Sequence, residues 1–260
     1  MGQSKLNNTA INNQTRHILG VPFFIGSRES AIKIAMKGGL VVAPSGPGLA
    51  VDLVKSQEYR KAISSADLAI IDSSALVLCW RCIVGEWLPR LSGLMFLRLI
   101  LQQPELKNTG TVFWVMPSAD DQARNLGWLV SQGFAHSPDD CYIAPRYHPN
   151  EIVDEPLLQL IESRRPKVVM IAIGGGVQEQ LGCFLRERLS YCPSIFCLGA
   201  AIAFLSGGQV KIPAWSDRFM IGWLLRICYS PRLYTSRYWE ARSLFSLVSK
   251  NRDKMPPLNS

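Results

Sequence analysis

The sequence predicts an α/β fold, in which a Rossmann-like, mostly parallel sheet is flanked by helices and followed by a basic helical C-terminal appendage. Short runs of apolar and β-branched residues, typical of strands buried on both faces, alternate with amphipathic stretches of helix length. The appendage is predicted by charge, because residues 211–254 hold 9 Lys and Arg against 3 Asp and Glu, which leaves the rest nearly balanced. With 260 residues, the chain can bury a substantial core.

The predicted strands and helices follow one another along the chain as βαβ units. Buried strands are expected at residues 40–43, 68–71, 111–115, 168–173 and 194–198. Helices are expected at residues 29–37, 57–65, 92–102, 120–132, 151–163 and 177–191. This order divides the chain into a polar N-terminal tail (1–17), an α/β core (18–210) and a basic, aromatic C-terminal appendage (211–260).

The polarity and the Cys content of the sequence indicate the cellular compartment of the protein. The first 17 residues are polar and lack the apolar core of a signal peptide, and no run of 18 uncharged apolar residues occurs in the sequence. The seven Cys are an odd number spread through apolar contexts, which fits a reducing compartment better than a disulfide framework. We therefore expect a cytoplasmic protein without a membrane-spanning helix.

Candidate chemistry lies where the predicted strands end, because parallel sheets place ligands at the carboxyl ends of their strands. Four segments meet this condition: residues 44–48, 72–74, 117–118 and 174–176. Asp72 directly follows a buried strand, where its carboxylate could act as a general base. The same residue, followed by Ser73 and Ser74, also suits the N-cap of a helix, and the sequence leaves both interpretations open.

The second informative segment is a strand that runs into Gly174, Gly175 and Gly176 and then into a helix. Glycines at this place let backbone N–H groups approach a phosphate at the N-terminus of a helix. The segment is not a dinucleotide fingerprint, because Glu179 stands where the third Gly of GxGxxG is needed, and no P-loop Lys follows. A nucleotide-diphosphate turn and a plain tight turn both remain open, the first being favoured.

No metal site is expected. Cys79 and Cys82 form a CxxC, but there is no second pair and the chain has only three His. The sequence also lacks any Asp-x-Asp with which a divalent cation could be held on a sugar-nucleotide diphosphate. Arg side chains or helix dipoles would have to neutralise the leaving group instead.

The appendage combines Arg with Trp, Tyr, Leu and Pro, notably at residues 223–226 and 231–239. Charge alone would attract nucleic acid, anionic lipid or phosphate groups equally well. The interleaved aromatic residues favour a membrane surface together with diphosphate binding, and no nucleic-acid recognition motif is present. We therefore expect the membrane surface, and not nucleic acid, as a partner.

Several motifs, taken in order over about residues 18–240, resemble the WecG/TagA/CpsF glycosyltransferases. Ala66-Asp67 followed by Asp72 resembles the family's "AD…DG", and Arg90 with Gly93 resembles its "ERxxG". Residues 174–179 resemble "GxPxQE" and residues 199–207 resemble "GVGGxFDFxxG". Residues 18–22, 213–215, 223–226 and 231–238 resemble the opening strand and the closing "RAPxW", "LEWLxRL" and "PxRxxRY".

The resemblance implies a GT-E fold and a reaction without cofactor or bound metal. Such enzymes move a sugar, typically N-acetylmannosamine, with inversion from a UDP-sugar to a polyprenyl-diphosphate-linked saccharide during assembly of extracellular polysaccharide or cell-wall polymers. It also implies that Asp72 is the base, that Gln178 and Glu179 line the nucleotide pocket, and that the protein can self-associate as a homo-oligomer. The other substrate-binding residues it implies are Ser45, Arg90, Gly174, Gly176 and three arginines that close over the diphosphates, Arg226, Arg232 and Arg237.

The chain departs from the family pattern at several positions. Where members have a Thr-x-Asn-like strand end that helps to hold the donor sugar, this chain has Ala43-Pro44-Ser45, so amide hydrogen bonds are lost. Ser73 replaces the Gly that follows the signature Asp. Because Asp72 is retained, these changes favour an active enzyme with an altered donor or acceptor. The alternative is a catalytically inactive nucleotide- or glycan-binding module at the membrane.

Overall fold

A computed structural model describes residues 14–135, 137–148, 151–209 and 242–259. Eight strands form one sheet in the spatial order β1-β2-β4-β3-β8-β7-β5-β6. The strands are β1 (Thr15–Ile18), β2 (Val21–Phe24), β3 (Gly39–Val42), β4 (Leu68–Ala69), β5 (Val112–Met116), β6 (Cys141–Ile143), β7 (Val168–Ile171) and β8 (Ser194–Cys197). Every neighbouring pair is parallel except β1 and β2, which confirms the predicted α/β class and mostly parallel sheet.

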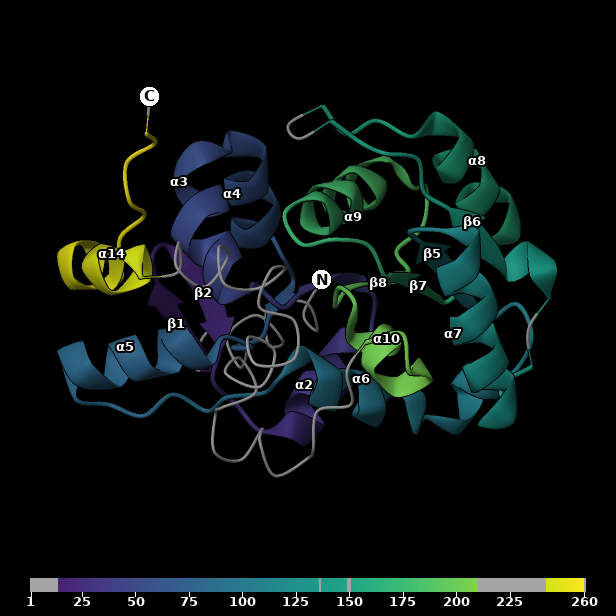
Figure 1. Cartoon of the computed structure of the whole chain (residues 1–260), viewed down its shortest axis with the longest axis horizontal. Helices are drawn as coiled ribbons and strands as arrows, with labels where there is room; N and C mark the ends of the chain where they lie inside the picture. The colour runs from purple at the N-terminus through teal and green to yellow at the C-terminus, as the bar shows by residue number, and fades with distance from the viewer. Residues whose placement is uncertain (1–13, 136, 149–150, 210–241, 260) are drawn as a thin grey trace, which may run out of the picture.

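Helices cover both faces of this sheet. They are α2 (Arg28–Ala35), α3 (Leu53–Lys55), α4 (Gln57–Ser64), α5 (Ser74–Val84), α6 (Gly93–Leu101), α7 (Ala119–Ser131), α8 (Glu155–Arg164), α9 (Val177–Arg188), α10 (Ala201–Ser206) and α14 (Ser243–Asn251). Shorter turns are the π-helix η1 (Gly48–Asp52) and the 3₁₀ turns η2 (Pro104–Lys107) and η3 (Pro138–Asp140). In Figure 1, α3, α4 and α9 lie on one side of the sheet, and α2, α6 and α10 lie on the other.

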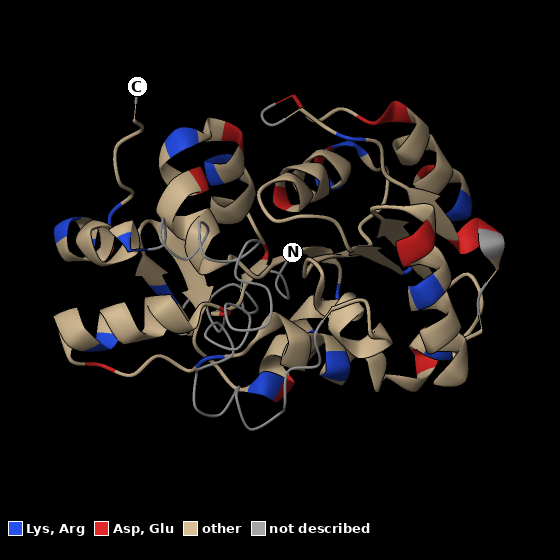
Figure 2. Ribbon diagram, in the orientation of Figure 1, with Lys and Arg blue, Asp and Glu red and all other residues tan. Residues whose placement is uncertain are grey.

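The core is split by the sheet, as the two-residue period of a strand requires. Along β3, Leu40 and Val42 belong to the cluster shared with α4 and α9, whereas Val41 belongs to the cluster shared with α2 and α6. The central strands β3, β7 and β8 contain no charged residue, and the charged residues drawn in Figure 2 lie mainly on the surrounding helices and loops. Continuous apolar runs were therefore a sound signal for strands buried on both faces.

The first two strands form a hairpin that the strand prediction did not include. Ile18 pairs with Val21, and the two residues between them, Leu19 and Gly20, both have positive φ, as in a two-residue type I′ turn. The backbone N–H groups of this turn donate to carbonyls of residues 252 and 253 at 2.7 and 3.0 Å. The end of the described chain thus packs on the hairpin, and β1 begins at Thr15, within the predicted N-terminal tail.

Predicted and observed elements differ in other places for identifiable reasons. The five predicted strands are all present: β4, β7 and β8 end earlier than predicted, whereas β3 and β5 keep the predicted length but are shifted by one residue. Strand β6 was missed because only three residues pair with β5. Helix α5 was missed because its sequence, SALVLCWRCIV, is apolar nearly throughout and shows no clear helical period. The division into tail, core and appendage stays a prediction, since residues 210–241 lie outside the described residues.

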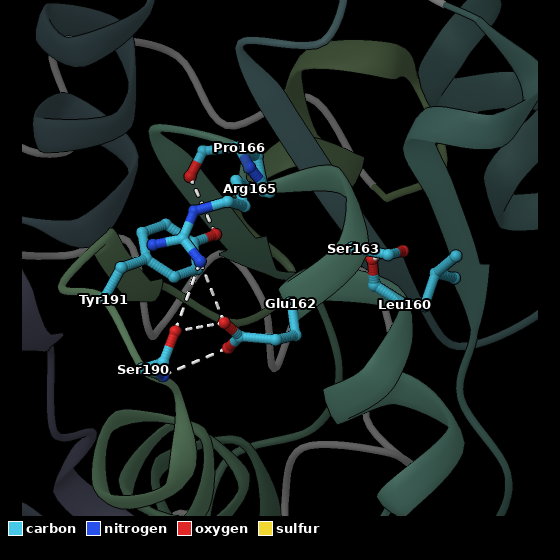
Figure 3. Close-up of polar contacts among 7 residues, drawn as sticks. All are labelled: Leu160, Glu162, Ser163, Arg165, Pro166, Ser190 and Tyr191. Atoms are coloured by element: carbon cyan, nitrogen blue, oxygen red, sulfur yellow. Dashed lines mark hydrogen bonds and ion pairs between the residues drawn. The ribbon is translucent and has the colours of Figure 1, made fainter.

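A charged cluster joins the elements at the amino ends of β7 and β8 (Figure 3). Arg165 ends α8 in the left-handed conformation, with its guanidinium 4.4 Å from the ring centroid of Tyr191. Its Nη1 donates to Glu162 at 3.0 Å and to Ser190 at 3.2 Å, and the Tyr191 hydroxyl donates to the Pro166 carbonyl at 3.0 Å. These contacts lie at the edge opposite the carboxyl ends of the strands, so they hold the scaffold.

Helix α14 lies in the C-terminal part of the chain, where Leu244 and Val248 are fully buried against the core. The hydroxyl of Ser243 donates to the carbonyl of Ala50 in η1 at 3.5 Å. Among the residues that the structure describes, no helix has the length and apolar character needed to cross a membrane.

Candidate active site

A cavity of about 370 Å³ opens at the carboxyl edge of the sheet. Its walls come from segments that follow four adjacent strands, β4, β3, β8 and β7. Of the residues singled out from the sequence, Ser45, Asp72, Gly174 and Gln178 line it together. Because parallel strands deliver their carboxyl ends to one edge, residues distant in sequence meet here as predicted.

Asp72 lies three residues beyond β4 and is half-buried in the cavity wall. Its Oδ1 accepts a hydrogen bond from the backbone N–H of Gly93, the first residue of α6, at 2.9 Å. Arg90 Nε donates to the backbone carbonyl of Asp72 at 2.8 Å, and the N–H of Leu91 donates to the Ile71 carbonyl at 3.0 Å. The segment before α6 therefore crosses the end of β4 and brings the positive end of the α6 dipole to the carboxylate.

The alternative that Asp72 serves as a helix N-cap is wrong for the helix that follows it. The N-cap of α5 is Ser73, whose hydroxyl accepts from the N–H of Leu76 at 3.2 Å. Asp72 is instead turned toward α6 and the cavity. A carboxylate has acceptor capacity for several hydrogen bonds, so the bond to Gly93 leaves room for a ligand.

The three glycines after β7 differ in their structural requirements. Gly176 is the N-cap of α9 with φ of 88°, a conformation that favours glycine. Gly174 and Gly175 are exposed, do not have positive φ, and would place a Cβ in open space. The fold itself therefore does not demand glycine at 174 and 175, both of which line the cavity. Without side chains at these two positions, the backbone of the turn is open to the cavity.

Gln178 links the two strand-end turns on this side of the cavity. Its buried side chain accepts from the N–H of Gly199 through Oε1 at 2.6 Å and donates through Nε2 to Glu179 at 3.0 Å. Gly199 has φ of 61° and also lines the cavity. The amide thus fixes the turn after β8 relative to the start of α9.

Glu179 is 1% exposed and lies behind the cavity wall instead of in it. Its Oε2 accepts from the N–H of Gly176 at 2.8 Å, which occupies one of the donors at the N-terminus of α9. Burial raises the pKa of Glu179 to about 7; its hydrogen bonds act in the opposite direction, and the charge of Asp52 adds to the rise. The side chain holds the glycine turn, and its burial keeps it out of reach of a ligand in the cavity.

Asp52 is a cavity residue that the sequence interpretation missed. It is the last residue of η1, half-buried, and lines the cavity. A Cβ added at Gly176 would lie 3.1 Å from its Oδ2, so the carboxylate rests against the glycine turn. The buried Tyr59 has its pKa raised by burial and then by the charges of Glu179 and Asp52. Asp52 lies ten residues beyond β3, and no sequence signal marks it.

The charged side chains among the described residues that line the cavity are both acidic, Asp52 and Asp72. Of the predicted binding residues, Arg90 acts on the backbone of Asp72, and Arg226, Arg232 and Arg237 lie outside the described residues. Within the described part of the chain, no three or more His, Cys, Asp or Glu are grouped so as to hold a metal ion. The described cavity is thus an anionic, hydrogen-bond-accepting surface.

A second, larger cavity of about 820 Å³ lies between α6, α7 and α10. It shares Leu94 and Phe204 with the first cavity but is lined mainly by apolar side chains such as Leu101, Trp128 and Phe134. Apart from Leu94 in α6 and the α10 residue Phe204, none of its residues lines the first cavity. The smaller cavity, which contains the convergent polar groups at the strand ends, is the candidate active site.

Comparison with known proteins identifies the family of the chain. A search of curated proteins gives no match. The family model described as "Glycosyl transferase WecG/TagA/CpsF family" matches residues 16–255, nearly the whole chain. The match includes the strand-end segments that line the cavity and the 210–241 segment. The chain therefore belongs to the WecG/TagA/CpsF family of glycosyltransferases, which act in the biosynthesis of cell-wall and other polysaccharides.

Proposed function

We propose that the protein is an inverting, metal-independent glycosyltransferase that moves a sugar from a UDP-sugar to a polyprenyl-diphosphate-linked saccharide. Membership of the family supports the glycosyltransferase activity. The donor, the acceptor and the stereochemistry are the proposed part. Metal independence is also part of the proposal, and the lack of an Asp-x-Asp in the sequence is what motivates it.

The observation that carries the proposal is the placement of Asp72. Its carboxylate lines the cavity at the carboxyl edge of the sheet, with one oxygen held at 2.9 Å by the N-terminus of α6. The α6 dipole favours negative charge at this position. A fixed carboxylate with spare acceptor capacity is what a general base needs in order to receive a proton from a bound hydroxyl.

Inversion then follows from a single displacement. The acceptor hydroxyl oxygen forms a bond to the anomeric carbon while its proton passes to the carboxylate of Asp72. The bond between the anomeric carbon and the UDP oxygen breaks, and UDP leaves with the electron pair. Arg90, which donates to the Asp72 carbonyl, and Gly93 act as positioning residues for the base.

The leaving diphosphate needs positive charge that the described cavity does not supply, since both charged residues lining it are carboxylates. Arg226, Arg232 and Arg237 are proposed to provide it, on the basis of the resemblance of their segments to the family's closing motifs. Ser45 and Gln178 with the glycines at 174 and 175 would contact the sugar-nucleotide. In this proposal Gly176 and Glu179 support the turn without touching the donor.

Release of UDP tests the assignment. The protein is incubated with a panel of UDP-sugars and a polyprenyl-diphosphate glycan, and UDP is measured. A general base raises the rate of such a reaction about 10²–10⁴-fold, so Asp72→Asn should lower the rate of UDP release by that factor. The matched control is Asp120→Asn, an exposed carboxylate in the first turn of α7. Full activity of Asp72→Asn would refute the assigned mechanism.

The departures around Ser45 also motivate a second candidate, a nucleotide- or glycan-binding module without catalysis. It predicts that calorimetry detects UDP binding while no donor in the panel is consumed. The first proposal predicts both binding and turnover. The two outcomes separate the candidates with a single preparation of protein.

We further propose that the protein works at the inner face of the cell membrane through residues 211–260. The support is the basic and aromatic composition of this segment. Co-sedimentation with vesicles that contain anionic lipid should retain the full chain and should weaken as salt is raised. Equal recovery with neutral vesicles, or none with either, would contradict the proposal.

A further inference from the structure

The larger cavity, of about 820 Å³, lies directly beside the candidate active site. The two cavities share Leu94 in α6 and Phe204 in α10. Leu94 follows Gly93, whose N–H donates to the carboxylate of Asp72 at 2.9 Å. The larger cavity therefore adjoins the active site next to the proposed base.

Helix α6 forms the wall of the larger cavity that leads away from the base. Its lining residues are spaced three and four apart, which places them on one face of the helix. They are Leu94, Arg98, Leu101 and the C-cap residue Gln102. Arg98 lies about 7.5 Å along the helix axis beyond Gly93, because each residue of an α-helix adds about 1.5 Å. Going outward from Asp72, the wall thus presents a leucine, then a cation, and then a second leucine.

The remaining walls of the larger cavity are mainly apolar and aromatic. Trp128 lies on α7, Phe134 follows that helix, and Phe204 and Leu205 lie on α10. Helix α10 packs against both α6 and α7, and Figure 1 shows the three helices next to one another. A pocket lined in this way binds an apolar chain through the hydrophobic effect, which needs no directed hydrogen bonds.

Two cations stand among these apolar residues. The side chain of Arg98 is exposed, and the Nζ of Lys107 lies 5.8 Å from the ring centroid of Phe134. Neither Arg98 nor Lys107 forms an ion pair with any residue that the structure describes. Arginine and lysine both bind phosphate groups well. An apolar pocket with two cations fits a molecule in which an anionic phosphate group is attached to a hydrocarbon chain.

We propose that the larger cavity binds the prenyl diphosphate of the acceptor, with the diphosphate at Arg98 and the first isoprene units beside Leu101 and Trp128. The proposal rests on the proposed function, which requires a polyprenyl-diphosphate-linked saccharide. In this acceptor the saccharide is joined to the diphosphate and the diphosphate to the chain. The same order is found along the α6 wall, from Asp72 through Arg98 to Leu101.

Binding of short prenyl diphosphates tests the proposal without any sugar. Isothermal titration calorimetry compares farnesyl diphosphate, which has three isoprene units, with isopentenyl diphosphate, which has one. The two ligands carry the same diphosphate, so the difference in their affinity reports the burial of the chain. Burial of one CH₂ group is worth about 4-fold in affinity, so the wild-type protein should bind farnesyl diphosphate at least about 100-fold more tightly.

Two substitutions separate the site of the chain from the site of the diphosphate. Trp128→Ala should weaken the binding of farnesyl diphosphate by at least about 10-fold and leave isopentenyl diphosphate unchanged. Its control is Val130→Ala, an exposed apolar residue of the same helix that lines neither cavity. Arg98→Gln should weaken both ligands by the same factor, at least about 10-fold. Its control is Arg28→Gln, an exposed arginine outside both cavities, and both controls should bind as wild type does.

The outcomes are distinct from those for the proposed function. A wild-type preference for farnesyl diphosphate that Trp128→Ala reduces and Val130→Ala does not, with equal losses for both ligands in Arg98→Gln, supports the proposal. No preference in the wild-type protein, or the same affinities in Trp128→Ala and Val130→Ala, overturns it, as when another part of the chain or a second copy fills the cavity. Release of UDP by the wild-type protein would then still support the glycosyltransferase mechanism. Equal urea-unfolding midpoints show that the variants are folded, and the exposed Arg98 gives the test if Trp128→Ala is not.

Discussion

The buried carboxyl of Glu179 should make stability depend on pH in a way that one substitution removes. It is 1% exposed, accepts from Gly176 and Gln178, and has its pKa raised mainly by burial from 4.5 to about 7. Below pH 4.5 the group is protonated in the folded and unfolded states alike. As the pH rises from 4.5 to 7 the unfolded chain ionises first, so the folded state loses stability across this window.

The size of the effect follows from the difference in pKa. A rise from 4.5 to about 7 corresponds to about 3 kcal/mol of stability lost between pH 4.5 and pH 8. Glu179→Gln removes the ionisation, and its amide oxygen can still accept from Gly176. Its NH₂ group, however, would face the NH₂ of Gln178, a mismatch of about 1–2 kcal/mol at any pH.

These two terms predict that the order of stability reverses with pH. At pH 5, Glu179→Gln should be less stable than wild type by about 1–2 kcal/mol, and at pH 8 it should be equally stable or more stable. Urea unfolding at the two values measures the difference. Glu105→Gln, at an exposed position in η2, is the control and should keep the wild-type dependence. If Glu179→Gln also keeps the wild-type pH dependence of stability, the carboxyl of Glu179 ionises in the folded protein as it would in water, and the reasoning fails.

Further predictions concern three glycines. Gly182→Ala should lower the free energy of unfolding by about 1–3 kcal/mol, because its Cβ would lie 2.6 Å from the buried Cys197 Sγ. Gly127→Ala is the control, at an exposed site in α7 with no atom within 4 Å of the new Cβ, and should raise the free energy of unfolding by up to about 1 kcal/mol. Equal effects of the two substitutions in urea unfolding would contradict the packing of α9 on the sheet. Gly174→Ala should change stability by less than about 0.5 kcal/mol yet raise the KM for the UDP-sugar, and an unchanged KM would show that no donor approaches this turn.

The sheet was predictable where its strands are buried on both faces. In β3, β7 and β8 every residue is buried, and the resulting apolar runs are visible without a structure. The edge elements were harder to predict because they follow no such rule. β1 has only one fully buried residue, Ile18, and β6 has none. Short edge strands depend on pairing with a neighbour, which a local sequence pattern does not report.

The candidate site, like the sheet, was predictable only in part. Asp72 and the glycines after β7 were found because a buried strand precedes each of them, and the order of the elements places both at one edge. Glu179 was expected to line the pocket by resemblance, but its side chain turns back to cap α9. Asp52 could not be found from the sequence, because its place in the cavity wall depends on the π-helical turn that it ends.

By itself the sequence determined the alternation of buried strands with amphipathic helices, and thereby the edge of the sheet at which residues distant in sequence meet. Hydrophobic periodicity is a local property, so it can be recognised along the chain. The tertiary structure decided which side chains face the cavity: Asp52 and Asp72 line it, while Glu179 lies buried behind the glycine turn. That choice depends on hydrogen bonds and close contacts between separate elements, such as Asp72 with Gly93, which exist only when the chain is folded.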